Sequence, residues 1–151
     1  MQLALQQALL AWSACGVPGQ VLSDAAAATH DACSLVRVQW NALERRGNAG
    51  LSHLGLRSLT LGPAVFQLLS QRRGRLVALD TLQMTLSHEI GHFYGLMAHS
   101  RRCVDVMSYC DNGRGEHCST RDGSNYRAVP QYRASLPTAC DIKRCRALNN
   151  H

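Results

Sequence analysis

The sequence predicts a single α+β domain that spans residues 1–151. Apolar residues recur at helical spacing near both ends of the chain and around residues 80–95, whereas two short segments in the first half alternate as strands do. A chain of 151 residues, of which 46% are hydrophobic, is long enough to bury one core and too short for us to expect two. We therefore expect one functional site on one scaffold.

The first expected helix covers residues 2–13, where apolar side chains recur at helical spacing until Gly16 and Pro18 interrupt the pattern. Residues 34–40 alternate with the period of two that is typical of a strand, and residues 56–61 repeat this alternation. A helix followed by two strands is therefore expected in this part of the chain.

The segments around and after these strands are harder to assign. Residues 47–52 are rich in glycine and are expected to form a loop. Residues 64–79 are ambiguous, and one arrangement is a short helix over residues 65–70 followed by a strand over residues 75–78. Other arrangements of this stretch stay open on the sequence alone.

A long amphipathic helix is expected over residues 80–95. Asp80 can cap its N-terminus, because Gln83 stands three residues later, where a capping box has Glu or Gln. Gly95 is a natural terminator, since glycine readily adopts the left-handed conformation that ends many helices. One side of this helix then carries Leu82, Leu86, Glu89 and Phe93.

The C-terminal third is expected to be a loop followed by a helix. Residues 101–130 are polar and contain several glycines, and we expect Cys103, Cys110 and Cys118 to hold this loop. A last helix is expected to start within residues 135–138.

The pattern His-Glu-x-x-His at residues 88–92 carries the clearest chemical signal. Four residues advance about 400° around a helix, so the imidazoles of His88 and His92 point the same way and can hold one zinc ion. Glu89 lies close to the metal but off the ligand line, where it can take a proton from a zinc-bound water. Zinc lowers the pKa of such a water towards about 7, and the carboxylate then passes the proton to the leaving amine.

The residues after this pattern make the signal more specific. Gly95 stands where the helix must stop and the chain must turn, and His99 follows just beyond it. A catalytic zinc has three protein ligands and one open position, and a turn at Gly95 is a way to bring a third ligand under the metal. We therefore expect a zinc site with His88, His92 and His99 as ligands and Glu89 as the general base and acid.

These residues, together with Met107, resemble the metzincin clan of zinc peptidases, whose pattern is His-Glu-x-x-His-x-x-Gly-x-x-His followed by a methionine turn, the Met-turn. The resemblance implies that Met107 lies beneath the zinc site and that Tyr109 stabilises the oxyanion, as in the astacin-like and serralysin-like branches. It also implies a zinc endopeptidase that hydrolyses a protein or peptide substrate. The family spacing would put the third histidine at Ala98, so we expect a one-residue insertion that the loop after the helix absorbs.

The similarity extends, through less specific features, over nearly the whole chain. An opening helix with Trp12, a strand over residues 36–40 and a closing helix resemble compact bacterial matrixin-like domains. The resemblance therefore implies a small metzincin-like domain, in which a twisted mixed sheet packs on an N-terminal helix and an active-site helix, followed by the Met-turn and a C-terminal helix. We expect the Asp105 carboxylate to anchor the Met-turn by hydrogen bonds.

Three other interpretations stay open on the sequence. The first is a non-catalytic zinc domain that uses a metzincin scaffold as an interaction module, although a purely structural site has no use for Glu89. The second is a gluzincin arrangement, in which a downstream glutamate, here Glu116, is the third ligand. The third is a basic nucleic-acid-binding protein with a net charge of +6, but we see no recognisable nucleic-acid module and expect no specific nucleic-acid partner.

Seven cysteines predict disulfides in a secreted protein. There is no Cys-x-x-Cys pair, which argues against a zinc ribbon, and the odd number leaves at least one thiol free or paired outside the chain. Residues 1–12 lack the basic start of a signal peptide, and no stretch approaches the roughly 20 apolar residues of a membrane span. We therefore expect a secreted monomer without a membrane span, whose signal lies outside this chain or departs from the standard pattern.

Overall fold

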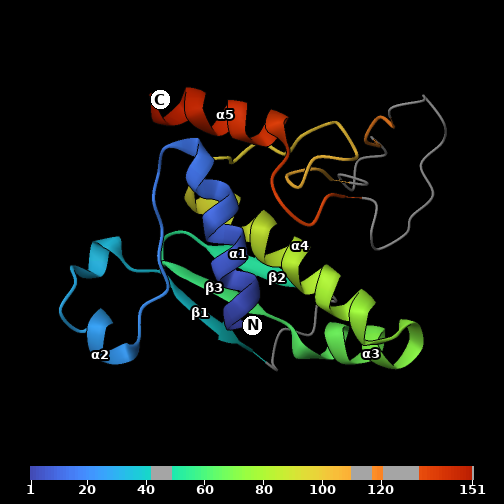
Figure 1. The fold of residues 1–151 in the computed structure, drawn as a ribbon, viewed down its shortest axis with the longest axis horizontal. Coiled ribbons are helices and arrows are strands. Elements are labelled where there is room, and N and C mark those ends of the chain that lie inside the picture. Colours follow the sequence, from blue (N-terminus) through green and yellow to red (C-terminus); the bar gives the residue numbers. More distant parts are fainter. Residues whose placement is uncertain (42–48, 110–116, 121–132, 151) are drawn as a thin grey trace.

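The computed structural model describes residues 1–41, 49–109, 117–120 and 133–150. These residues form an α+β domain, which confirms the expected fold class (Figure 1). None of the helices that they form is both long and apolar enough to cross a membrane. The elements are α1 (Gln2–Trp12), η1 (Ser13–Cys15), α2 (Asp24–Ala27), η2 (Ala32–Ser34), β1 (Arg37–Trp40), β2 (Gly50–His53), β3 (Ser58–Leu61), α3 (Pro63–Arg73), α4 (Arg75–Phe93) and α5 (Ala139–Asn149).

The three strands form a small mixed sheet in the order β1-β3-β2. β1 runs parallel to β3, whereas β2 runs antiparallel to β3 on its other side. Leu59 and Leu61 of β3 are fully buried in the same hydrophobic core as Trp12 of α1. Figure 1 shows α1 and α4 side by side across the sheet, so these two helices form one layer over the strands.

Trp12 fixes α1 against α4. Its side chain is fully buried, and its Nε1 donates a hydrogen bond of 2.9 Å to the carbonyl oxygen of Ser87. One turn earlier on α4, Gln83 Nε2 donates a hydrogen bond of 2.9 Å to the carbonyl oxygen of Ala4. Because Ser87 directly precedes His88, α1 supports the segment of α4 that carries the histidine pattern.

α4 begins at Arg75 rather than at Asp80. The strand expected over residues 75–78 is therefore wrong, and Asp80 lies inside the helix instead of capping it. Gly74, which has a φ of 95°, separates α3 from α4. Ala78 is buried, so the buried face of α4 extends into its first turns. Extending an existing helix by one turn costs less than nucleating a separate element, so the apolar run joins the helix that follows it. The short helix expected before it is present within α3.

The loop expected over residues 47–52 is wrong for its described part, because β2 starts at Gly50. Glycine is needed here for space: a Cβ at this position would lie 2.6 Å from Thr85 Cγ2 and 3.0 Å from Glu89 Cγ. β2 can therefore run close to α4, which a larger residue would prevent. Residues 47 and 48 lie outside the described residues.

The other expected elements are confirmed, with small shifts of their ends. β1 begins at Arg37 after η2, and β3 begins at Ser58 after a turn in which Arg57 has a φ of 47°. α1 covers nearly the whole expected N-terminal helix. α5 follows Thr138, whose side chain accepts a hydrogen bond from the backbone N–H of Asp141, so the C-terminal helix starts where it was expected.

Two disulfides are present among the described residues, which confirms the expectation of disulfide bonds. Cys15–Cys145 joins the end of η1 to α5, and Cys103–Cys118 holds the segment between α4 and α5. Three cysteines remain outside these bonds: Cys33 and Cys140 are free, and Cys110 lies outside the described residues.

Candidate metal centre

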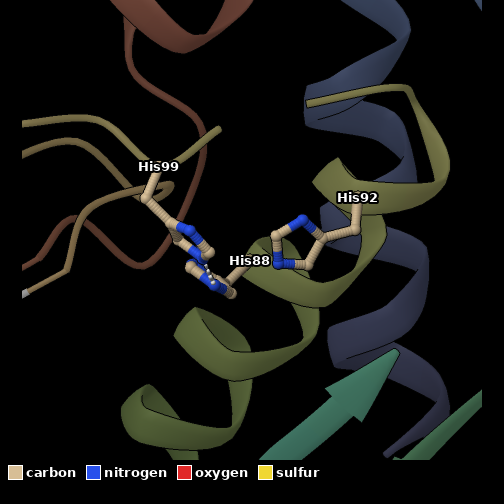
Figure 2. Close-up of side chains that lie close together, drawn as sticks. All are labelled: His88, His92 and His99. Atoms are coloured by element: carbon tan, nitrogen blue, oxygen red, sulfur yellow. Dashed lines mark hydrogen bonds between the residues drawn. The ribbon is translucent and has the colours of Figure 1, made fainter. Parts of the chain in front are cut away.

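Three histidines from two neighbouring segments converge on one point (Figure 2). His88 and His92 lie one turn apart on α4, and His99 lies in the loop that follows this helix. Each offers one ring nitrogen, and the three nitrogens all lie within 4.8 Å of one another. The Nε2 atoms of His88 and His99 are 3.1 Å apart. This group, which we call the histidine group, can hold a metal ion.

Backbone carbonyls orient two of the three rings. His88 Nδ1 lies 2.7 Å from the carbonyl oxygen of Val106, and His92 Nδ1 lies 3.0 Å from the carbonyl oxygen of Leu96. A carbonyl oxygen can only accept, so each Nδ1 carries the hydrogen and donates it. The Nε2 lone pairs of His88 and His92 are therefore free for a metal, as in many histidine metal sites.

The surroundings of the histidine group favour neutral imidazoles. Burial lowers the pKa of His88 well below its usual value, and the positive charge of Arg133 lowers it further. Burial also lowers the pKa of His99 to about 4, followed by the charges of His92 and Arg133. Metal ligands must be deprotonated, so both shifts keep the lone pairs available. His99 Nε2–H can donate a hydrogen bond of 3.1 Å to the His88 Nε2 lone pair, and a bound cation would replace this hydrogen.

The loop after α4 returns His99 to the two histidines of the helix. Gly95 has a φ of 89°, and the N–H of Leu96 donates to the carbonyl oxygen of Gly91, which closes the end of the helix. The N–H of Met97 then donates a hydrogen bond of 2.8 Å to the carbonyl oxygen of Gly95, which forms a three-residue γ-turn. Through this turn His99 reaches the other two histidines.

Met107 lies beneath the segment of α4 that carries His88 and His92. Its side chain is fully buried, and its Sδ atom would lie 2.3 Å from a Cβ added to Gly91. Gly91 lies between the two histidines in the sequence, so the methionine packs against the backbone of the turn that presents them. We call residues 105–108 the Met107 turn.

Asp105 anchors the Met107 turn, as expected from the sequence. Its carboxylate is fully buried and accepts hydrogen bonds from Ser100 Oγ at 2.6 Å and from Thr138 Oγ1 at 2.8 Å. The N–H of Ser108 donates to the carbonyl oxygen of Asp105, which closes the turn. Asp105 therefore links the loop after α4, the Met107 turn and the start of α5.

Asp141 anchors the same turn from α5, a role that was not expected from the sequence. Its fully buried carboxylate accepts from the backbone N–H of Val106 at 2.9 Å and from that of Met107 at 3.4 Å. The Met107 N–H and the Val106 carbonyl belong to one peptide group, so Asp141 fixes the peptide that orients His88. Thr138 and Asp141 stand three residues apart in a capping-box pattern, and that spacing was the available signal.

Glu89 and the histidine group line a common cavity of about 300 Å³. Glu89 is only 9% exposed, and its Oε2 atom accepts a hydrogen bond of 2.7 Å from Ser52 Oγ. Ser52 lies on β2, and residues 49–52 line the cavity together with Tyr109. The sheet therefore contributes directly to the site, which no spacing in the sequence indicates.

Tyr109 stacks on His99 at the wall of this cavity. The two ring centroids are 3.6 Å apart, and the ring planes meet at 27°. The side chain is 47% exposed, so its ring covers the histidine and still faces solvent. Tyr109 thus lies beside the histidine group.

Arg133 is a further cavity residue that was not expected from the sequence. Its Nη1 donates at 3.0 Å to the carbonyl oxygen of Ser108 and lies 2.9 Å from His88 Nδ1. His88 Nδ1 already donates its hydrogen to the carbonyl oxygen of Val106. Arg133 therefore acts on His88 through its positive charge, which lowers the pKa of the imidazole. No motif surrounds Arg133, so the sequence holds no signal for it. Glu116, the alternative third ligand, lies outside the described residues.

Comparisons with known proteins assign no family to the chain: no family model matches it, and no curated protein or solved structure is significantly similar to it. Its own structure defines its class, an α+β domain with a three-histidine group that can hold a metal ion.

Proposed function

We propose that the protein is a zinc-dependent endopeptidase of the metzincin kind. The observation that carries this proposal is a single cavity in which three convergent imidazoles lie next to a largely buried glutamate, Glu89. Neutral nitrogen donors suit zinc, and a carboxylate beside them suits proton transfer to and from water. The combination of both groups in one cavity fits a hydrolase better than either group alone.

The number of donors supports a catalytic zinc over a structural one. In the part of the chain that the structure describes, the group has three members, His88, His92 and His99. Structural zinc sites have four protein ligands, whereas catalytic sites have three and keep one position for water or substrate. The three histidines line the cavity, so a substrate has access to them.

The roles of the residues follow from where they lie. Zinc held by the histidine group supplies Lewis acidity, which acidifies water and polarises a carbonyl oxygen. Glu89 takes the proton of the attacking water and passes it to the nitrogen of the leaving amine. Tyr109 at the cavity wall donates a hydrogen bond from its hydroxyl to the oxyanion that forms at the former carbonyl oxygen.

The position of β2 supports an extended peptide as the substrate. Among the described strands, β2 pairs with β3 alone and forms an edge of the sheet, and residues 49–52 line the cavity. An edge strand offers unpaired N–H and C=O groups, which can bind an extended chain as an additional strand. A peptide bound in this way runs along the cavity that contains Glu89.

The two disulfides support secretion of this enzyme. Cys15–Cys145 and Cys103–Cys118 are the kind of bond that persists in oxidising compartments and is rare in the cytosol. We therefore propose that the protein acts on extracellular proteins or peptides.

Replacement of Glu89 tests the proposed function. Glu89→Gln keeps the shape of the side chain but removes its basicity, so we expect unchanged zinc content and a loss of about 100-fold or more in peptide hydrolysis. Zinc is measured by elemental analysis, and hydrolysis is measured with an unfolded protein substrate. Asp80→Asn, an exposed change on the same helix, is the control. A Glu89→Gln variant as active as the parent would contradict the proposal, and a zinc-loaded parent without hydrolysis would favour a non-catalytic zinc module.

A further inference from the structure

We infer that Ser52 is a positioning residue that holds the Glu89 carboxylate in place for proton transfer. The inference rests on the proposed function, because Ser52 acts through Glu89. The hydrogen bond between the side chains of Ser52 and Glu89 does not depend on that function, and it can be measured in a protein without activity.

One hydroxyl group reaches two oxygens of the same residue. Ser52 Oγ lies 2.7 Å from Glu89 Oε2 and 2.9 Å from the Glu89 carbonyl oxygen. Neither a carboxylate nor a carbonyl oxygen carries a hydrogen, so Ser52 is the donor, and its single hydrogen is shared between the two oxygens in a three-centre hydrogen bond. The contact bridges the two ends of the Glu89 side chain and restrains every torsion between them. Among the described residues, none donates to Oε1, so this oxygen is left for proton transfer.

The register of the sheet directs Ser52 towards α4. Side chains alternate along a strand, so Gly50 and Ser52 share one face of β2, and their partners in β3 are Leu61 and Leu59. Both leucines are fully buried in the core that includes α4, so this is the face of β2 that meets the helix. A slip of one residue would turn Ser52 to the opposite face.

Gly50 completes the same wall. A Cβ at this position would lie 3.0 Å from Glu89 Cγ and 3.5 Å from Glu89 Oε1. The missing side chain at Gly50 therefore leaves room for the glutamate, and the Ser52 hydroxyl binds its end. Since Glu89 is 9% exposed, solvent has limited access to replace the hydroxyl.

Restraint of Glu89 affects the rate rather than binding. A glutamate has three side-chain torsions, and proton transfer requires its oxygen to lie within hydrogen-bond reach of the reacting water. Without the Ser52 hydroxyl the carboxylate samples more rotamers, so a smaller fraction of complexes is ready to react. The histidine group and the strand edge, which would bind metal and peptide, are unchanged.

The kinetic test compares three variants of the zinc-loaded full chain. For Ser52→Ala we expect kcat on a quenched fluorescent peptide to fall about tenfold, with KM and zinc affinity within about twofold of the parent. Ser52→Thr keeps the hydroxyl on a residue that suits a strand, so we expect it to restore kcat to within about threefold of the parent. Ser58→Ala, on β3 and outside the cavity lining, is the matched control and keeps the parent's kinetics.

A second measurement needs no activity. A double-mutant cycle of Ser52→Ala and Glu89→Ala, followed by urea unfolding of the metal-free protein, measures the coupling between the two side chains. Each single variant removes the same hydrogen bond between the two side chains. We therefore expect the effect of the double variant on the unfolding equilibrium constant to differ about fivefold from the product of the two single effects. A parallel cycle of Ser58→Ala and Glu89→Ala is expected to be additive.

The two measurements separate the inference from the proposed function. A parent that binds zinc but cleaves no peptide contradicts the proposed function, while the unfolding cycle still decides whether Ser52 holds Glu89. An additive cycle, an unchanged kcat in Ser52→Ala, or a Ser52→Thr variant as slow as Ser52→Ala overturns the role of the hydroxyl. Coupling in the cycle, a selective loss of kcat and its recovery in Ser52→Thr support it.

Discussion

The Sδ atom of Met107 occupies space that a side chain at Gly91 would need. A Cβ added to Gly91 would lie 2.3 Å from this sulfur and 3.0 Å from Cζ2 of Trp12. At Gly91 the backbone of α4 therefore packs directly against Met107 and against Trp12 of α1. The contact lies directly beneath the turn of helix that presents His88 and His92.

Gly91→Ala is expected to destabilise the protein by about 1–3 kcal/mol, although alanine favours helix, because the added methyl overpacks the core. Equilibrium unfolding in urea measures the change. Gly55→Ala is the control, since nothing lies within 4 Å of a Cβ at that position. Adding Met107→Ala should reduce the penalty of Gly91→Ala, and a Gly91→Ala protein as stable as its parent would argue against the close contact.

His99→Ala is expected to weaken zinc binding by about 100-fold or more, because it removes one of three donors from the histidine group. Competition with a chromogenic chelator gives the dissociation constant. His30→Ala, at an exposed histidine far from the group in sequence, should bind zinc as the parent does. Equal affinity in the two variants would show that His99 is not a ligand.

Asp141→Ala is expected to lower the free energy of unfolding by about 2–4 kcal/mol, because it leaves the N–H groups of Val106 and Met107 buried without their acceptor. We also expect zinc affinity to fall about tenfold, since the same peptide orients His88. Urea unfolding and chelator competition measure the two effects. Asp80→Ala, an exposed change within α4, should alter stability by less than about 0.5 kcal/mol; a loss typical of a helix cap would instead restore Asp80 to that role.

Removal of the Cys15–Cys145 bond by serine substitution is expected to cost about 2–5 kcal/mol of stability. Removal of Cys103–Cys118 should cost less, because this bond closes a segment of 15 residues rather than 130. Thermal and urea unfolding of the two double variants test the order. The opposite order would mean that native packing, and not chain entropy, sets the contribution of these bonds.

The histidine-bearing part of α4 was predictable from local sequence, because helical geometry alone aligns His88 with His92. The end of the helix was predictable from Gly95. The start was not: Asp80 has the pattern of a cap, but the apolar run before it extends the helix back to Gly74, where a glycine with positive φ interrupts it. Local patterns identify residues that can cap a helix, and packing decides which of them does.

Ser52 and Arg133 were not predictable, because each reaches the site through contacts between segments distant in sequence. Ser52 meets Glu89 through the register of β2 with β3, and β2 itself was hidden because Gly50 reads as a loop residue. In the structure this glycine serves the close approach of a strand to a helix. Spacing within one segment carries no information about such contacts.

The Cys15–Cys145 bond also changes what one backbone cut can do to this molecule. Any single cut between these two cysteines leaves one of them on each fragment, so both fragments stay in one covalent molecule. The tether keeps their effective concentration high, which favours reassembly of the helix layer over dissociation. Under the proposed function the protein is exposed to attack by its own copies, and a chain nicked in this way would run as a single species on a gel until the bond is reduced.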